Sequence, residues 1–101
     1  MRILVMFDLP VVTAEQRRRY VHFRKFLIKS GFLMLQESVY CKLVLNTSVE
    51  NAVRENVYKN CPEEGLVQIL SVTEKQFQKM DLIIGEGHHE ILDSDERLVV
   101  L

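Results

Sequence analysis

The sequence predicts an α+β domain in which two helices cover one face of a four-stranded antiparallel sheet. Short β-branched and aromatic runs alternate with two longer stretches whose apolar residues recur at helical spacing. Turn residues separate these segments, and 101 residues with 48% hydrophobic content suit one domain with a core of its own. The segments follow the order strand, helix, strand, strand, helix, strand, which is the ferredoxin-like arrangement.

Four strands are expected where short runs of apolar residues are bounded by turn residues. They are residues 2–7, 32–36, 39–45 and 66–72. Glu37 and Ser38 leave so short a connection that the second and third strands should form a hairpin. Residues 82–84 and 97–101 are apolar enough for two further short strands.

Capping residues predict where the helices begin. Thr13 is the expected N-cap of the first helix, with Gln16 at the spacing of a capping box, and Gly31 is a natural stop. A second helix is expected after Asn46-Thr47-Ser48, whose side chains suit a helix cap. The expected helical ranges are 14–30, 49–60 and a short turn at 74–80. The domain is therefore expected to span 1–85, with a C-terminal tail or strand at 86–101.

The first strand has no alternation between polar and apolar residues from Ile3 to Phe7. Helices can cover only one face of the sheet, so something else must cover the other face. A second copy of the same sheet is the simplest cover, and we expect a homodimer packed sheet to sheet. The alternative is a strand covered by the chain's own tail.

The formal net charge of −1 conceals a strong asymmetry along the chain. Residues 1–45 carry eight Lys or Arg and three Asp or Glu, whereas residues 46–101 carry five and eleven. The first helix holds most of the basic residues, so it could lie along a phosphate backbone. The alternative is a solvated helix face. The candidate nucleic-acid-binding residues are Arg17, Arg18, Arg19, Arg24, Lys25 and Lys29.

Asp8 is the candidate metal ligand. It ends an apolar strand next to Leu9-Pro10, which holds its carboxylate on a rigid element. Carboxylates suit Mg²⁺ or Mn²⁺, and Mg²⁺ is often held by one or two of them with water and phosphate. In a two-fold dimer, Asp8 of each copy could share a metal that activates water for phosphodiester cleavage. An aspartate that simply caps a turn is the alternative.

Other titratable groups carry weaker signals. His88 and His89, with Glu86 and Glu90, lack the spacing of a metal motif and are expected in a polar loop. Cys41 and Cys61 form no CxxC pair, so we expect reduced, packed thiols in a cytoplasmic protein. No apolar run is long enough for a signal peptide or a membrane span. No membrane partner is therefore expected.

The chain resembles the CRISPR-associated adaptation family that we call Cas-two, most closely its members from type II systems. The resemblance covers about residues 1–85 and rests on three features besides the arginine-rich helix start. They are Met6-Phe7-Asp8-Leu9-Pro10, Ser30-Gly31-Phe32, and Gln36-Glu37-Ser38-Val39-Tyr40. Other members carry an arginine between this glycine and this glutamine, where Phe32 to Leu35 stand here.

The resemblance implies a protein of spacer acquisition that forms a dimer and bridges two dimers of the Cas-one integrase on double-stranded DNA. It also implies a metal-dependent endonuclease acting on single-stranded RNA or double-stranded DNA, with Asp8 as the catalytic Mg²⁺ or Mn²⁺ ligand. The alternative from another class is a ferredoxin-like regulatory or ligand-binding module without nuclease activity.

Overall fold

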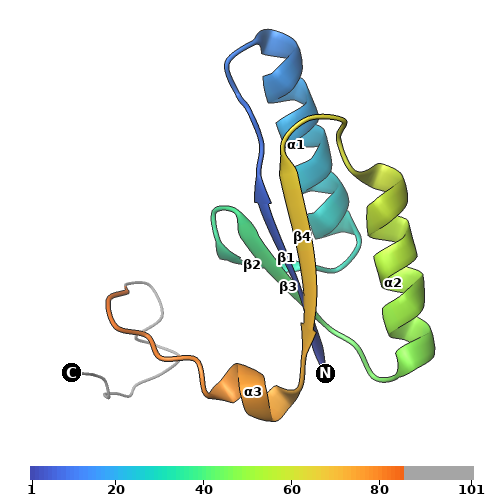
Figure 1. The fold of residues 1–101 in the computed structure, drawn as a ribbon, viewed down its shortest axis with the longest axis vertical. Coiled ribbons are helices and arrows are strands. Elements are labelled where there is room, and N and C mark those ends of the chain that lie inside the picture. The colour runs from blue at the N-terminus through green and yellow to red at the C-terminus, as the bar shows by residue number, and fades with distance from the viewer. Residues whose placement is uncertain (86–101) are drawn as a thin grey trace.

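The computed structural model describes residues 1–85, and they form the expected α+β domain (Figure 1). The elements are β1 (Arg2–Asp8), α1 (Ala14–Lys29), β2 (Leu33–Gln36), β3 (Val39–Leu43), α2 (Thr47–Asn60), β4 (Leu66–Val72) and α3 (Glu74–Gln78). The sheet order is β2-β3-β1-β4, and every neighbouring pair of strands is antiparallel. With α1 and α2 on one face, this is the ferredoxin-like arrangement that the sequence predicts.

The caps predicted from sequence are present. The Thr13 hydroxyl accepts a hydrogen bond from the Gln16 amide, and the Gln16 side chain accepts one from the Thr13 amide, which completes the capping box of α1. Asn46 caps α2 by accepting a hydrogen bond from the Val49 amide at 2.9 Å. Gly31 follows the end of α1 with φ +94°, in the left-handed conformation that glycine adopts readily.

The short strand predicted at 82–84 is wrong, because residues 81–85 have no regular secondary structure. A strand needs a neighbour for its backbone hydrogen bonds, and residues 82–84 pair with no strand within 1–85. The predicted strand at 97–101, the loop around His88 and the whole predicted tail at 86–101 lie outside the described residues. No helix among residues 1–85 is long and apolar enough to cross a membrane.

The core lies between the sheet and the two helices. Ile3, Val5 and Phe7 of β1 point into it and are 0–5% exposed. Phe23 and Leu27 of α1 pack against them, which places the predicted helical stripe in the core. The alternate residues of β1, such as Leu4, point to the opposite face because side chains alternate along a strand.

Helix α3 is tied to the first residue of β1. The Arg2 guanidinium donates to the Glu74 carboxylate at 2.6 Å and lies 4.2 Å from the centre of the Phe77 ring. The hydrogen bond from Arg2 lowers the pKa of Glu74. This contact sets where the chain leaves β4.

Gly65 connects the end of α2 to the start of β4 beside the last residues of β1. Its φ is +99°, and a Cβ there would lie 2.7 Å from Leu9 Cδ2 and 2.8 Å from the Asp8 carbonyl oxygen. Only glycine lets β4 approach the Asp8–Leu9 backbone this closely. The register of β4 against Asp8 therefore depends on this residue.

We predict that Gly65→Ala destabilises the fold more than Gly31→Ala. Both substitutions put a Cβ at positive φ, which costs about 1–2 kcal/mol. At Gly31 the Cβ would meet the flexible Lys42 side chain, whereas at Gly65 it would meet backbone. The backbone clash should cost roughly 1–3 kcal/mol further. Urea denaturation of the two variants measures the difference, and equal losses would contradict the close approach.

Candidate functional site

Asp8 is the last residue of β1, and its side chain is exposed. It is paired in the sheet with Leu66 of β4, and it lies on the same face as Leu4 and Met6. This is the face that α1 and α2 do not cover. The rigid position predicted for the carboxylate is therefore present.

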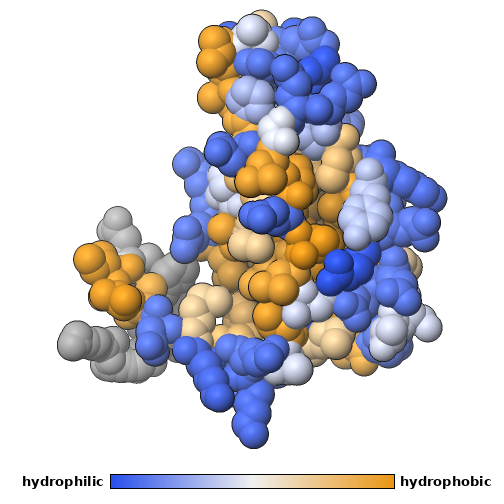
Figure 2. All heavy atoms as spheres, viewed as in Figure 1, coloured by the Kyte–Doolittle hydropathy of each residue, from blue (hydrophilic) through white to orange (hydrophobic). Residues whose placement is uncertain are grey.

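The open face around Asp8 is apolar (Figure 2). Four leucines from the other three strands share this face by their register and are 48–70% exposed: Leu33, Leu43, Leu66 and Leu70. Beneath them, Cys41 is buried at the sheet centre, near Arg2. An exposed apolar surface of this kind is typical of a protein–protein contact.

Asp8 belongs to no cluster of metal-ligating side chains in the described part of the chain. Residues 1–85 contain no group of three or more His, Cys, Asp or Glu side chains that could hold a metal. A single exposed carboxylate fits Mg²⁺ only when other oxygens come from water, phosphate or another copy of Asp8. Within residues 1–85 the donor set therefore does not fit a metal held by side chains of one copy alone, whereas it would fit a metal shared between two copies.

Three of the six candidate nucleic-acid-binding residues form side-chain hydrogen bonds to other residues of the domain. Arg17 Nη1 donates to the carbonyl oxygens of Val11 and Val12, at 3.2 and 2.9 Å, and so holds the loop before α1. The Arg24 guanidinium donates from Nε to the Tyr40 hydroxyl at 2.9 Å, and this bond raises the pKa of Arg24.

Arg19 is the third engaged residue. It donates to Glu15 at 2.8 Å within α1 and to Glu64 at 3.2 Å in the loop before β4. Gln16 also donates to Glu64, at 3.3 Å. This network joins the start of α1 to the loop that carries Gly65.

The other three residues, Arg18, Lys25 and Lys29, form a row on the solvent side of α1. All three are exposed, and none of their side chains has a hydrogen bond or ion pair to another residue within 1–85. At 3.6 residues per turn they lie opposite the buried Phe23 and Leu27. We call Arg18, Lys25 and Lys29 the basic row.

Sequence reasoning missed the ion pair of Glu64 and the role of Gly65 in the close approach of two backbone segments. Glu64 partners a residue 45 positions earlier in the chain, which no local pattern reveals. A glycine between a predicted helix and a predicted strand can signal a close backbone approach, and this signal could have found Gly65. Cys41 and Cys61 are both free thiols, and burial raises the pKa of Cys61.

The fold and the site together define a small ferredoxin-like domain with an exposed strand-end aspartate and a basic helix. The family model described as CRISPR associated protein Cas2 matches residues 1–80. The chain therefore belongs to the Cas2 family, which is the family that the sequence resemblance indicates.

Relatives and a solved structure agree with this assignment. A protein of Treponema denticola named CRISPR-associated endoribonuclease Cas2 is 58% identical over 101 residues, covering 100% of both chains. A Streptococcus mutans protein of the same name is 48% identical, covering 100% of this chain and 93% of its own. The crystal structure of Streptococcus pyogenes Cas2 at pH 6.5 has a TM-score of 0.63 at 17% identity, covering 84% of this chain and 100% of that chain, and so shows the same fold.

We predict that Arg24→Ala lowers the urea midpoint of unfolding, whereas Lys25→Ala leaves it unchanged. The Tyr40 side chain is fully buried, and Arg24 is the partner of its hydroxyl among residues 1–85. Removing that partner leaves a buried polar group unsatisfied, which is costly. In a Tyr40→Phe background the Arg24→Ala loss should largely disappear. A loss that persists in that background would show that Arg24 acts through another contact.

Proposed function

We propose that this Cas2 chain acts in spacer acquisition as a homodimer that binds duplex DNA and bridges two dimers of the Cas-one integrase. The observation that carries the proposal is the basic row, because Arg18, Lys25 and Lys29 are exposed without partners among residues 1–85. Cations placed in this way neutralise phosphates irrespective of base sequence. Arg18 and Lys29, at the two ends of the row, are 11 residues apart in sequence, or roughly 16 Å along the helix axis.

The open face supports the dimer. A face with four half-exposed leucines is costly to leave in water, and an isologous contact would cover it with the same face of a second copy. The basic rows lie on the helical side, so both would stay exposed in a sheet-to-sheet dimer. Two rows on one particle would allow contacts at two places along a duplex.

We predict that charge reversal of the basic row, Arg18→Glu with Lys25→Glu and Lys29→Glu, abolishes duplex binding at moderate salt. For wild type, the logarithm of affinity should fall linearly with the logarithm of salt concentration, with a slope of about 0.9 per phosphate contact. Fluorescence anisotropy with a labelled duplex of arbitrary sequence measures both. The matched control is Lys75→Glu with Lys79→Glu on and next to α3, which should bind like wild type.

Two outcomes would overturn the DNA-binding proposal. Unchanged affinity in the basic-row variant would exclude this face of α1. Absence of binding by wild type even at low salt would favour the ferredoxin-like ligand-binding or regulatory module instead. Sedimentation of each variant should accompany the titrations, so that loss of the dimer is not mistaken for loss of a contact.

Metal-dependent endonuclease activity is a second candidate function, and the position of Asp8 favours it. Asp8 and the exposed leucines share one face, so a sheet-to-sheet dimer would bring the Asp8 carboxylates of both copies toward the same interface. Two carboxylates could hold one Mg²⁺ or Mn²⁺, which would supply an activated water for hydrolysis of single-stranded RNA or duplex DNA. The relatives named above as endoribonucleases support cleavage of RNA.

We predict that Asp8→Asn eliminates Mg²⁺-dependent cleavage of labelled RNA and DNA, because an amide is a poor ligand for a hard cation. The matched control is Asp81→Asn, which changes another exposed carboxylate and should cleave like wild type. Chelator should stop wild-type cleavage, and added Mg²⁺ should restore it. Equal cleavage by wild type and Asp8→Asn would show that Asp8 is not the metal ligand.

A further inference from the structure

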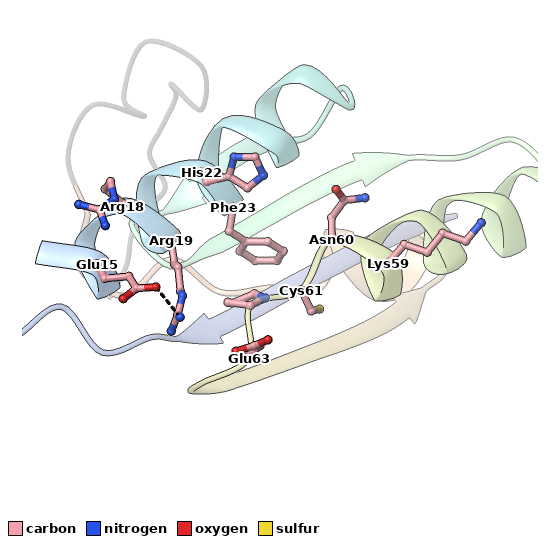
Figure 3. Close-up of a pocket in the computed structure, with 10 residues that line it drawn as sticks. Glu15, Arg18, Arg19, His22, Phe23, Lys59, Asn60, Cys61 and Glu63 are labelled. Atoms are coloured by element: carbon pink, nitrogen blue, oxygen red, sulfur yellow. Dashed lines mark hydrogen bonds and ion pairs between the residues drawn. The ribbon is translucent and has the colours of Figure 1, made fainter. Parts of the chain in front are cut away.

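A groove runs along the outer side of the helix pair, facing away from the open sheet face. One part, of about 500 Å³, lies between the N-terminal half of α1 and the C-terminal end of α2 (Figure 3). A second part, of about 470 Å³, lies between the C-terminal end of α1 and the N-terminal half of α2, and it shares no lining residue with the first part. Helix α1 has 16 residues and is therefore about 24 Å long. Both parts lie along the same two helices, so one helical peptide could contact both.

The floor of the groove is apolar. Phe26 and Val53 are partly buried and pack against the core, with Phe32 and Val57 fully buried beneath them. Val49 on the rim is 39% exposed. In the first part Phe23 points from α1 toward the segment that carries Cys61 (Figure 3). A ligand would need apolar side chains to gain from this floor.

The rim of the groove is mainly basic. Arg18, His22 and Lys59 line its first part (Figure 3), and Lys29 lines its second. Arg19 also borders the groove, but Glu15 and Glu64 neutralise it. Glu63 is the one lining carboxylate besides Glu15 within the described part of the chain. The rim therefore keeps a net positive charge.

We propose that this groove binds an acidic, amphipathic peptide segment of a partner protein, docked as a helix. Its apolar side chains at helical spacing would fill the floor, and its carboxylates would meet Arg18, Lys29 and Lys59. A nucleic-acid backbone alone could use the rim but not the floor. The groove lies on the side of the helices, so it stays open in a sheet-to-sheet dimer and the inference does not depend on the proposed function.

Selection from a phage-displayed library of random 16-residue peptides, against the full-length protein, tests the proposal. The expected peptides combine Asp or Glu with apolar residues spaced three and four apart. Ala52→Glu, which puts a like charge on the groove wall, should weaken the selected peptides at least tenfold. Asn51→Glu is the matched control, because Asn51 is also exposed on α2 but does not line the groove.

Chemical-shift mapping with a selected peptide locates the contact. Perturbed amides at His22, Asn56 and Lys59 would support the groove, and perturbations confined to the open sheet face would overturn it. Selection of basic peptides, selection of none, or equal binding by Ala52→Glu would also overturn the proposal. A DNA duplex that displaces the peptide, and whose own binding is weakened equally by Ala52→Glu, would also overturn the proposal. That result would assign the groove to nucleic acid.

The chain's own residues 86–101 are a competing occupant, because they contain five Asp or Glu among apolar residues. If Ala52→Glu, but not Asn51→Glu, shifts the resonances of that segment in the unliganded full-length protein, the segment itself occupies the groove. That result would replace the partner peptide and overturn the proposal as stated.

Discussion

Strand β1 lies at the centre of the sheet, between β3 and β4, and must be apolar toward both of its faces. Ile3 and Val5 are fully buried against the helices, while Leu4 and Met6 point toward the open face. Burial of each large apolar side chain contributes about 1.5–3 kcal/mol. The helices cover one side alone. On the other side Leu4 is only 9% exposed because its sheet neighbours cover it, so the apolar surface that needs a further cover comes from the leucines of the other three strands. Asp8 ends this same strand, and its place on the open face follows from the alternation.

The position of α1 follows from the ring of Phe7. Its centre lies 6.0 Å from Tyr20, 5.3 Å from Phe23 and 5.7 Å from Tyr40, with edge-on and stacked geometries. Once this cluster fixes the buried side of α1, helical geometry fixes the direction of every other residue on it. Arg24 is directed to the Tyr40 hydroxyl, whereas the basic row is directed to solvent.

The strands, helices and caps could be predicted because their signals are local. Period, capping residues and turn glycines set the element bounds to within about two residues, and the uniform apolarity of residues 3–7 indicated a second covered face. The strand expected at 82–84 was wrong because apolar composition cannot supply a pairing partner. The partners of Arg17, Arg19 and Arg24 depend on tertiary contacts, so a charge count could not separate structural from available arginines.

The same distinction changes how the charge asymmetry should be understood. Two of the acids in the second half of the chain neutralise bases in the first half, through Glu64 with Arg19 and Glu74 with Arg2. Two of the basic residues in the first half of the chain therefore form ion pairs that hold the α2–β4 loop and α3 to the rest of the fold. These pairs are at least partly exposed, so their energetic effect is modest, but they remove cations from the surface that a polyanion could meet. The electrostatic footprint is consequently narrower than the sequence indicates. Arg17 and Arg24 still contribute to it, because both are exposed and their hydrogen-bond partners are neutral oxygens that leave the positive charge in place. The basic row is the part of this surface whose cations have no partner within residues 1–85.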